Sequence, residues 1–145
     1  MKKYLFLSMA IIALLFTNCK KDDESEASSG STYLKMKIDN DNEQIFDADV
    51  TVLLGYLNIV GTKSSNTLTI QFSADSSGTV DDMNYSITYS EDNNQIFDSE
   101  TASYSELEIT KNDTSGKIVA GYFTVEYYDD MQNLHTAEGS FDLEY

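Results

Sequence analysis

The sequence predicts an all-β fold, an antiparallel β-sandwich or partly closed β-barrel of about 8–10 strands. Three observations predict it. Apolar and polar residues alternate with period two through residues 33–145, clusters rich in Asp, Asn and Ser separate the alternating segments, and no stretch shows convincing helical periodicity. The length of 145 residues fits a single domain.

The alternating segments follow one another along the chain as half-buried strands. In the first, Leu34, Met36 and Ile38 share one face and polar residues stand between them. The later inward sets are Leu68, Ile70 and Phe72; Tyr85, Ile87 and Tyr89; Leu107 and Ile109; Val119, Phe123, Val125 and Tyr127; and Phe141, Leu143 and Tyr145. Turns are predicted at residues 63–66, 75–78, 112–116 and 129–133, which are rich in residues that tolerate turn geometry.

Residues 50–60 read in two ways. Apolar side chains occupy both faces of a strand here, and Val50, Leu53, Leu54 and Leu57 also fit one face of a helix. Enrichment in Val and Ile and the polar turn at residues 63–66 favour strand. We therefore predict two strands bent at Gly55.

The first 18 residues have the layout of a cleaved signal peptide. Lys2 and Lys3 precede an apolar stretch, residues 5–16, that is shorter than the roughly 20 residues a membrane-spanning helix needs. Cys19 follows at the end of this stretch and is the only cysteine, so it has no partner for a disulfide within the chain. Residues 19–31 are acidic and lack large apolar side chains, which predicts a flexible tether of a few nanometres before one domain over residues 32–145.

The segment around Cys19 resembles the signal of a bacterial lipoprotein. Leu15-Phe16-Thr17-Asn18-Cys19 is similar to the site at which such signals are cleaved before a cysteine that is then acylated. The next residues, Lys20, Lys21, Asp22, Asp23 and Glu24, resemble the tag that directs Bacteroidota lipoproteins to the outer leaflet of the outer membrane. The resemblance implies a lipid-anchored protein on the cell surface, because acyl chains on Cys19 would hold it in the leaflet.

The remainder of the chain resembles a small all-β domain of uncharacterised function found in Bacteroidota surface lipoproteins. The resemblance lies in Ile45-Phe46-Asp47-Ala48, residues 57–62, Leu68-Thr69-Ile70 and Gly121-Tyr122-Phe123, and it covers residues 33–145. It brings no catalytic residues with it. We expect a surface-anchored binding or accessory module.

A seven-residue segment occurs twice. Residues 41–47, DNEQIFD, recur as residues 92–98, DNNQIFD. A pseudo-repeat that aligns residues 45–91 with residues 96–145 is one interpretation. The other is that both copies are edge or turn segments whose Ile and Phe fill the core while the flanking acids stay in water.

One acidic loop has part of the spacing of a calcium site. If Asp39 is counted as position one of a calcium-loop template, Asp41 and Glu43 stand at positions three and five. Asp47 stands at position nine. Position six is Gln44 instead of Gly, and position twelve is Val50 instead of Glu. The sequence leaves open only a weak, exposed Ca²⁺ site, and it predicts no other cofactor.

Composition excludes several functions. The formal charge of −16 opposes nucleic-acid binding. With one histidine and one cysteine, the chain has few residues for a catalytic triad or a His/Cys metal site. We expect a non-catalytic protein. Tyr122 and Tyr128 fall on the outer face of one strand and are candidate contact groups. We expect an outer-membrane protein partner, with a small ligand or glycan, bound with help from calcium, as the alternative.

Overall fold

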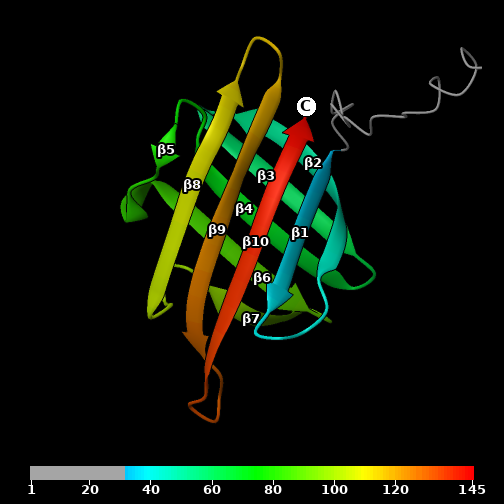
Figure 1. Ribbon diagram of the computed structural model, residues 1–145, viewed down its shortest axis with the longest axis vertical. Helices are drawn as coiled ribbons and strands as arrows, with labels where there is room; N and C mark the ends of the chain where they lie inside the picture. Colours follow the sequence, from blue (N-terminus) through cyan, green and yellow to red (C-terminus); the bar gives the residue numbers. More distant parts are fainter. Residues whose placement is uncertain (1–31) are drawn as a thin grey trace, which may run out of the picture.

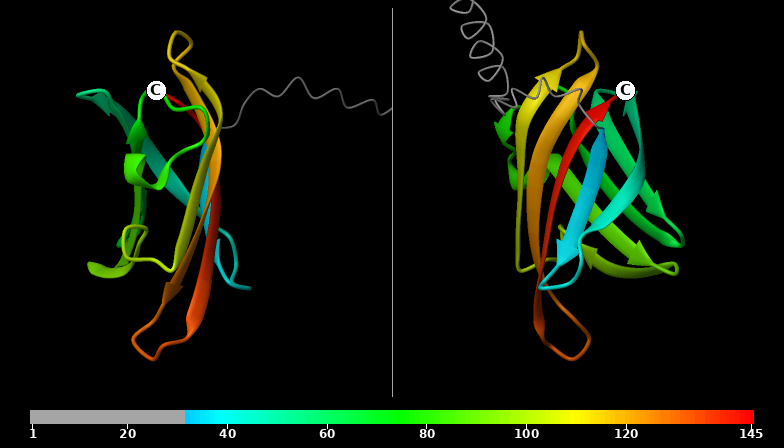
Figure 2. Two further views of the ribbon diagram at one scale, coloured as in Figure 1. Left: turned by 90° about the vertical axis from the view of Figure 1, so that its left-hand side faces the viewer. Right: turned by 45° about the vertical axis from the view of Figure 1, so that its right-hand side comes forward.

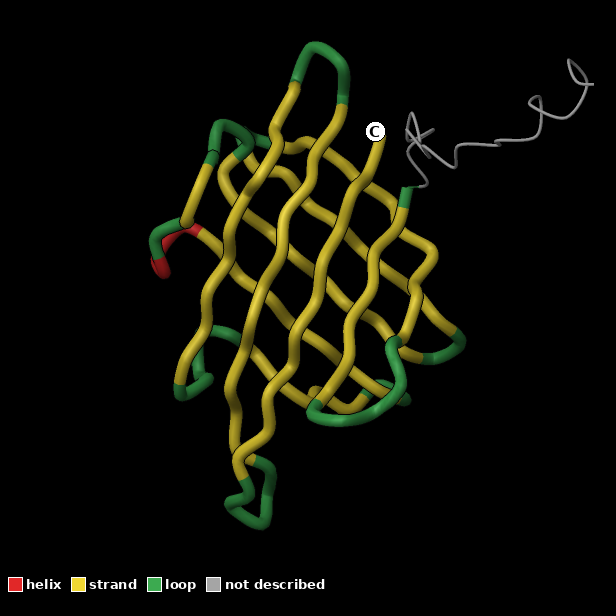
Figure 3. Tube along the Cα trace, viewed as in Figure 1, coloured by secondary structure: helices red, strands yellow, loops and turns green. Residues whose placement is uncertain are grey.

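The computed structural model describes residues 32–145, which form one continuous antiparallel sheet of ten strands (Figure 1). The strands are β1 (Tyr33–Ile38), β2 (Gln44–Leu53), β3 (Tyr56–Lys63), β4 (Asn66–Ser73), β5 (Gly78–Thr79), β6 (Tyr85–Glu91), β7 (Asn94–Asp98), β8 (Tyr104–Asp113), β9 (Ile118–Tyr128) and β10 (Leu134–Glu144). One turn of 3₁₀ helix, Asp82–Asn84, precedes β6. Figure 3 shows that loops gather at the two ends of the strands.

The sheet curls until its two halves face each other as layers (Figure 2). The strand order is β5-β8-β9-β10-β1-β2-β3-β4-β6-β7, so the first and last long strands of the chain are neighbours. Strand β2 passes from one layer to the other, because Phe46 is opposite Leu34 of β1 whereas residues 47–53 pair with β3. Strands β5 and β7 are the two edges of this order. The predicted all-β fold, between a sandwich and a partly closed barrel, is confirmed.

The core fills the space between the layers with the inward-facing residues of alternating strands. Among residues 32–145 every buried side chain is apolar or a tyrosine. The fully buried ones include Leu34, Met36, Leu57, Ile59, Leu68, Ile70, Phe72, Ile87, Tyr89, Leu107, Phe123 and Phe141. Each predicted inward set contributes to this core, because one face of every long strand meets the opposite layer.

Two glycines make room for large rings in the core. A Cβ atom on Gly139 would collide with the ring of Phe123 and lie 2.7 Å from the carbonyl oxygen of Lys35. A Cβ atom on Gly121 would lie 2.8 Å from the ring of Phe141. The register of the β9–β10 ladder is continuous from Leu134 to Glu144, so Gly139 introduces no bulge there. Gly139 therefore serves close packing.

Residues 50–60 form two strands, as predicted, and the bend at Gly55 is a hairpin turn between β2 and β3. The helical alternative is wrong. The repeated heptapeptides give different structures, because the first copy leads into an interior strand and the second into the edge strand β7. Phe46 and Phe97 are both buried, and Ile96 is partly buried against the core, whereas Ile45 is exposed. The strands that follow also differ, since β2 pairs with β3 whereas β7 pairs with β6.

Candidate functional site

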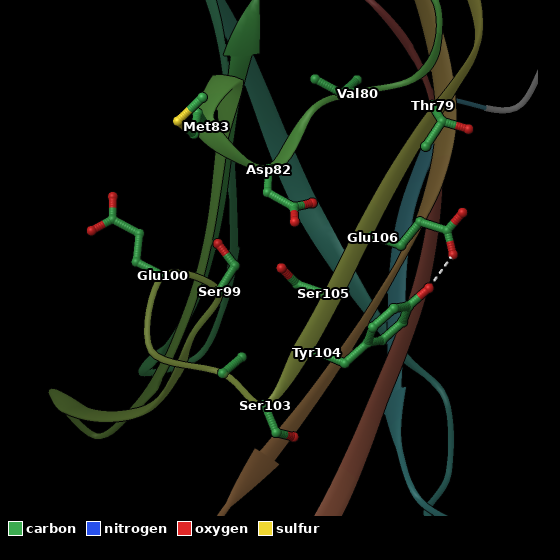
Figure 4. Close-up of a pocket in the computed structure, with 11 residues that line it drawn as sticks. Thr79, Val80, Asp82, Met83, Ser99, Glu100, Ser103, Tyr104, Ser105 and Glu106 are labelled. Carbon is green, nitrogen blue, oxygen red and sulfur yellow. Dashed lines mark hydrogen bonds between the residues drawn. The ribbon is translucent and has the colours of Figure 1, made fainter.

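An open groove lies at the sheet edge beside β8. Strand β5 covers only Ile109 and Glu108 of β8, so within the described residues no strand lies beside Tyr104–Leu107 on that side. The groove has a volume of about 510 Å³ and is lined by Thr79, the 3₁₀ turn, the loop 99–103 and the start of β8 (Figure 4). It is wide enough for a small ligand.

Two hydrogen bonds join the elements that border the groove. The hydroxyl groups of Tyr85 and Ser105 are hydrogen-bonded at 2.9 Å, and the backbone N–H of Val80 donates to the carbonyl of Leu107 at 2.8 Å. Burial raises the pKa of Tyr85, so this hydroxyl stays neutral. Asp82, Ser99 and Ser105 point into the space between the layers (Figure 4). The groove is therefore open to solvent and presents polar groups from three segments of the chain.

A second surface lies on the outer face of β8 and β9. It consists of Tyr104, Glu106, Glu108, Tyr122 and Tyr128, which we call the tyrosine–glutamate face. The three tyrosines are 47%, 44% and 55% exposed. Glu108 stands directly opposite Tyr122 across the β8–β9 ladder, which places ring and carboxylate side by side.

The carboxylates fix the tyrosine hydroxyls on this face. The Tyr104 hydroxyl donates to Glu106 Oε2 at 2.6 Å, and the Tyr122 hydroxyl donates to the carboxylate of Glu108. These hydrogen bonds raise the pKa of both tyrosines above its usual range. The result is a surface of oriented aromatic rings bordered by negative charge. Tyrosine is one of the residues enriched in protein interfaces.

The structure confirms that Tyr122 and Tyr128 share the outer face of β9. It adds Tyr104, which the sequence analysis missed. The sequence does contain a signal for Tyr104, because this residue alternates with Glu106 and Glu108 on the outward face of β8. Recognising it required extending that strand two residues toward its start.

The acidic loop does not assemble the predicted calcium ligands. Asp39 binds His135 and the backbone N–H of Thr136, while Glu43 forms an ion pair with Lys35 at 3.0 Å. Asp47 lies in β2 opposite Thr62. Across residues 32–145 no group of three or more His, Cys, Asp or Glu side chains is arranged to hold a metal ion.

The single histidine joins two loops. His135 Nδ1 lies 2.6 Å from Asp39 Oδ2, and Nε2 lies 3.4 Å from Asp129 Oδ2. The hydrogen bond with Asp39 is the main reason that the pKa of His135 is raised. Hydrogen bonds from Asn133 lower the pKa of Asp129 to about 2. Because both ring nitrogens face carboxylates, this side chain links the β1–β2 loop to the β9–β10 turn.

Three results bear on the remaining predictions. Cys19 and the segment Lys20–Glu24 lie outside the described residues. No helix within residues 32–145 has the length and apolar character needed to cross a bilayer. Comparison of the chain with protein-family models, curated protein sequences and solved structures gives no match.

Proposed function

We propose that this protein is a lipid-anchored, non-catalytic binding or accessory module on the surface of the outer membrane. Its anchor is the acylated Cys19, and its export depends on Lys20, Lys21 and the acids that follow. The partner is another protein of the outer membrane. The strongly negative charge argues against nucleic acid as a ligand.

The observation that carries the proposal is the tyrosine–glutamate face outside a filled core. The interior offers no room for a ligand, because large aromatic and aliphatic side chains of both layers pack against each other there. Tyr104 and Tyr122 are held by carboxylates, so little side-chain entropy is lost when a partner covers them. Rigid tyrosines of this kind often dominate the energy of a protein interface.

The test is copurification of tagged, full-length protein from native outer membranes in mild detergent. A stoichiometric partner should accompany the unchanged protein and be lost from a Cys19→Ala variant, which lacks the anchor. The double variant Tyr104→Ser with Tyr122→Ser should weaken the association about tenfold or more, because interface tyrosines each contribute on the order of 1–2 kcal/mol. Val60→Thr, an exposed change on the opposite layer, is the matched control.

Recovery of the protein alone from all preparations would refute the partner proposal. Equal recovery of a partner with the double tyrosine variant would move the interface elsewhere on the domain. Both results are informative only if the variants fold, which circular dichroism spectra and thermal unfolding of the purified proteins establish.

The groove favours a second candidate function, binding of a small glycan. Its volume and its polar lining, with Asp82, Ser99 and Ser105 pointing inward, suit hydroxyl groups. Titration of a glycan panel, followed by nuclear magnetic resonance of backbone amides, tests this candidate. Perturbed amides confined to residues 79–83 and 99–106, and lost in Asp82→Asn, would support it, whereas an unperturbed groove would exclude it.

A further inference from the structure

The tip of the β2–β3 hairpin is apolar in a chain dominated by acids. Residues 51–58, TVLLGYLN, contain no charged side chain. Leu53 is 65% exposed and Leu54 is 90% exposed, and the neighbouring Val52 and Tyr56 are exposed as well. These four residues, which we call the hairpin tip, form the longest run of exposed apolar side chains within residues 32–145.

The hairpin tip is exposed because the hairpin extends past the core. Burial alternates in β2 as far as Val50 and then ends, so both faces of the last residues of β2 meet water, while Leu57 opposite Val52 stays buried. Leu54 and Gly55 both have positive φ, +54° and +85°, in a two-residue turn where Asn and Gly are usual. A leucine in this position has a strained backbone, and its side chain is not buried. No packing contact of the fold explains why a leucine stands here.

The hairpin tip lies at the end of the fold from which the N-terminal chain departs. Strand β1 starts at Tyr33 and runs antiparallel to β2, with Leu34 opposite Phe46, so the start of β1 and the end of β2 point the same way. Figure 2 shows the hairpin and the start of β1 at the same end of the long axis, on different layers. The turn between β9 and β10 is at the other end (Figure 1).

We propose that the hairpin tip is a second lipid contact, in which Leu53 and Leu54 enter the leaflet that holds the anchor. This inference rests on the lipid anchor of the proposed function. The predicted tether, residues 19–31, has an expected span of roughly 20 Å, so the anchor keeps the hairpin tip close to the lipid surface. Two leucines that bind lipid weakly by themselves then bind at a high effective concentration.

A lipid surface fits the hairpin tip better than a protein partner does. Four side chains on one narrow turn offer far less than the roughly 800 Å² per partner of a standard protein interface. The acidic residues near the hairpin tip also favour one class of lipid headgroup. The backbone N–H of Ala74 donates to the carbonyl of Gly55 at 2.8 Å, which places Asp75 beside the turn, and Asp49 lies further along β2. These acids favour zwitterionic over anionic headgroups.

The chain has no tryptophan, so a single introduced tryptophan reports on its own surroundings. Full-length protein purified from membranes is reconstituted into phosphatidylcholine vesicles as Leu53→Trp, with Met131→Trp in the β9–β10 turn as the matched control, since Met131 is also exposed. Tryptophan at position 53 should emit at shorter wavelength and be quenched by lipids brominated in their acyl chains. Tryptophan at position 131 should be quenched only by acrylamide in the water.

Two further measurements separate the possible failures. Flotation of the vesicles reports the anchor itself, and a chain that does not float refutes both the anchor and this inference. A chain that floats while tryptophan 53 stays in water refutes the lipid contact alone. Adding Val52→Thr and Leu54→Asn to Leu53→Trp should abolish bromolipid quenching without affecting flotation, and retained quenching would overturn the role of the apolar side chains.

Discussion

The ring of Phe46 meets the ring of Tyr89 edge-on, with 6.3 Å between the ring centroids. Phe97 packs against the same tyrosine at 5.7 Å, so the two copies of the repeated heptapeptide place their phenylalanines on one shared residue. The row continues from Phe97 to Tyr127 and ends at His135. These rings connect an interior strand, the edge strand β7 and the opposite layer.

Truncation of Phe97 should remove the attachment of the edge strand to this row. We expect Phe97→Ala to lower the free energy of unfolding by about 3 kcal/mol, because it leaves a cavity between two aromatic neighbours. Urea denaturation followed by far-ultraviolet circular dichroism measures the change. Tyr89→Phe is the comparison, since it keeps all rings and removes only the hydroxyl.

That hydroxyl accepts from Asn66 Nδ2 at 3.0 Å and donates to Glu91 at 2.6 Å. Its loss should cost about 1 kcal/mol. A Phe97→Ala variant no less stable than Tyr89→Phe would show that the edge strand does not depend on ring packing.

The pairing of His135 with Asp39 should make stability depend on pH. The pKa of His135 is raised in the folded protein, so the folded state holds its proton more tightly than the unfolded chain. This contribution is complete below the unfolded histidine pKa of about 6.5 and is lost as the pH rises through the folded-state pKa. Stability measured by urea denaturation should therefore fall as the pH rises above about 6.5.

His135→Gln is the control for this pH dependence. It removes the titrating group, and its stability should change less over the same range. Identical slopes for the two proteins would mean that other groups control stability there. The lowered pKa of Asp129 acts at the other extreme, because its stabilisation is present above the usual aspartate pKa and is lost near pH 2.

Strand content was predictable because the signal is local. Inward sets such as Leu68, Ile70 and Phe72 indicate which face of a strand is buried. This indication does not depend on which strand lies beside it. The order of strands was not predictable in this way. Nothing within residues 33–38 indicates that β1 pairs with the last strand of the chain, because that pairing depends on the curl of the whole sheet.

The candidate sites also include features that local sequence predicts and features that depend on the assembled sheet. The outward position of Tyr122 and Tyr128 on β9 was predicted correctly from parity within one strand, and their role as contact groups stays a prediction. The contact between His135 and Asp39 joins residues 96 positions apart, and no spacing rule relates them. The exposed hairpin tip has the composition of a core strand in the sequence. The position of Val52, Leu53, Leu54 and Tyr56 past the core is a property of the assembled sheet.

Gly139 should not tolerate a side chain. An added methyl group would press on the Phe123 ring and on the backbone oxygen of Lys35, and the backbone cannot move aside without disturbing the β1–β10 ladder. We expect Gly139→Ala to lower the free energy of unfolding by about 2 kcal/mol. Ser140→Ala, on the outer face of the same strand, should stay within about 0.5 kcal/mol of the parent in thermal unfolding.

A second change can relieve this clash. Phe123→Leu shortens the opposing side chain, so the double variant should lose less stability than the two single variants combined. Strict additivity would indicate that the collision with Lys35 dominates.

The strain at Leu54 should be removable. The left-handed conformation costs a leucine about 1 kcal/mol relative to asparagine, which occupies this first position of a two-residue hairpin turn readily. Because Leu54 is almost fully exposed, Leu54→Asn sacrifices no packing, and we expect the free energy of unfolding to rise by about 0.5–1 kcal/mol. Leu53→Asn is the control. It lies in β2 without positive φ, so the same side chain should bring no gain there, and a Leu54→Asn protein less stable than the parent would show that Leu54 supports the fold itself.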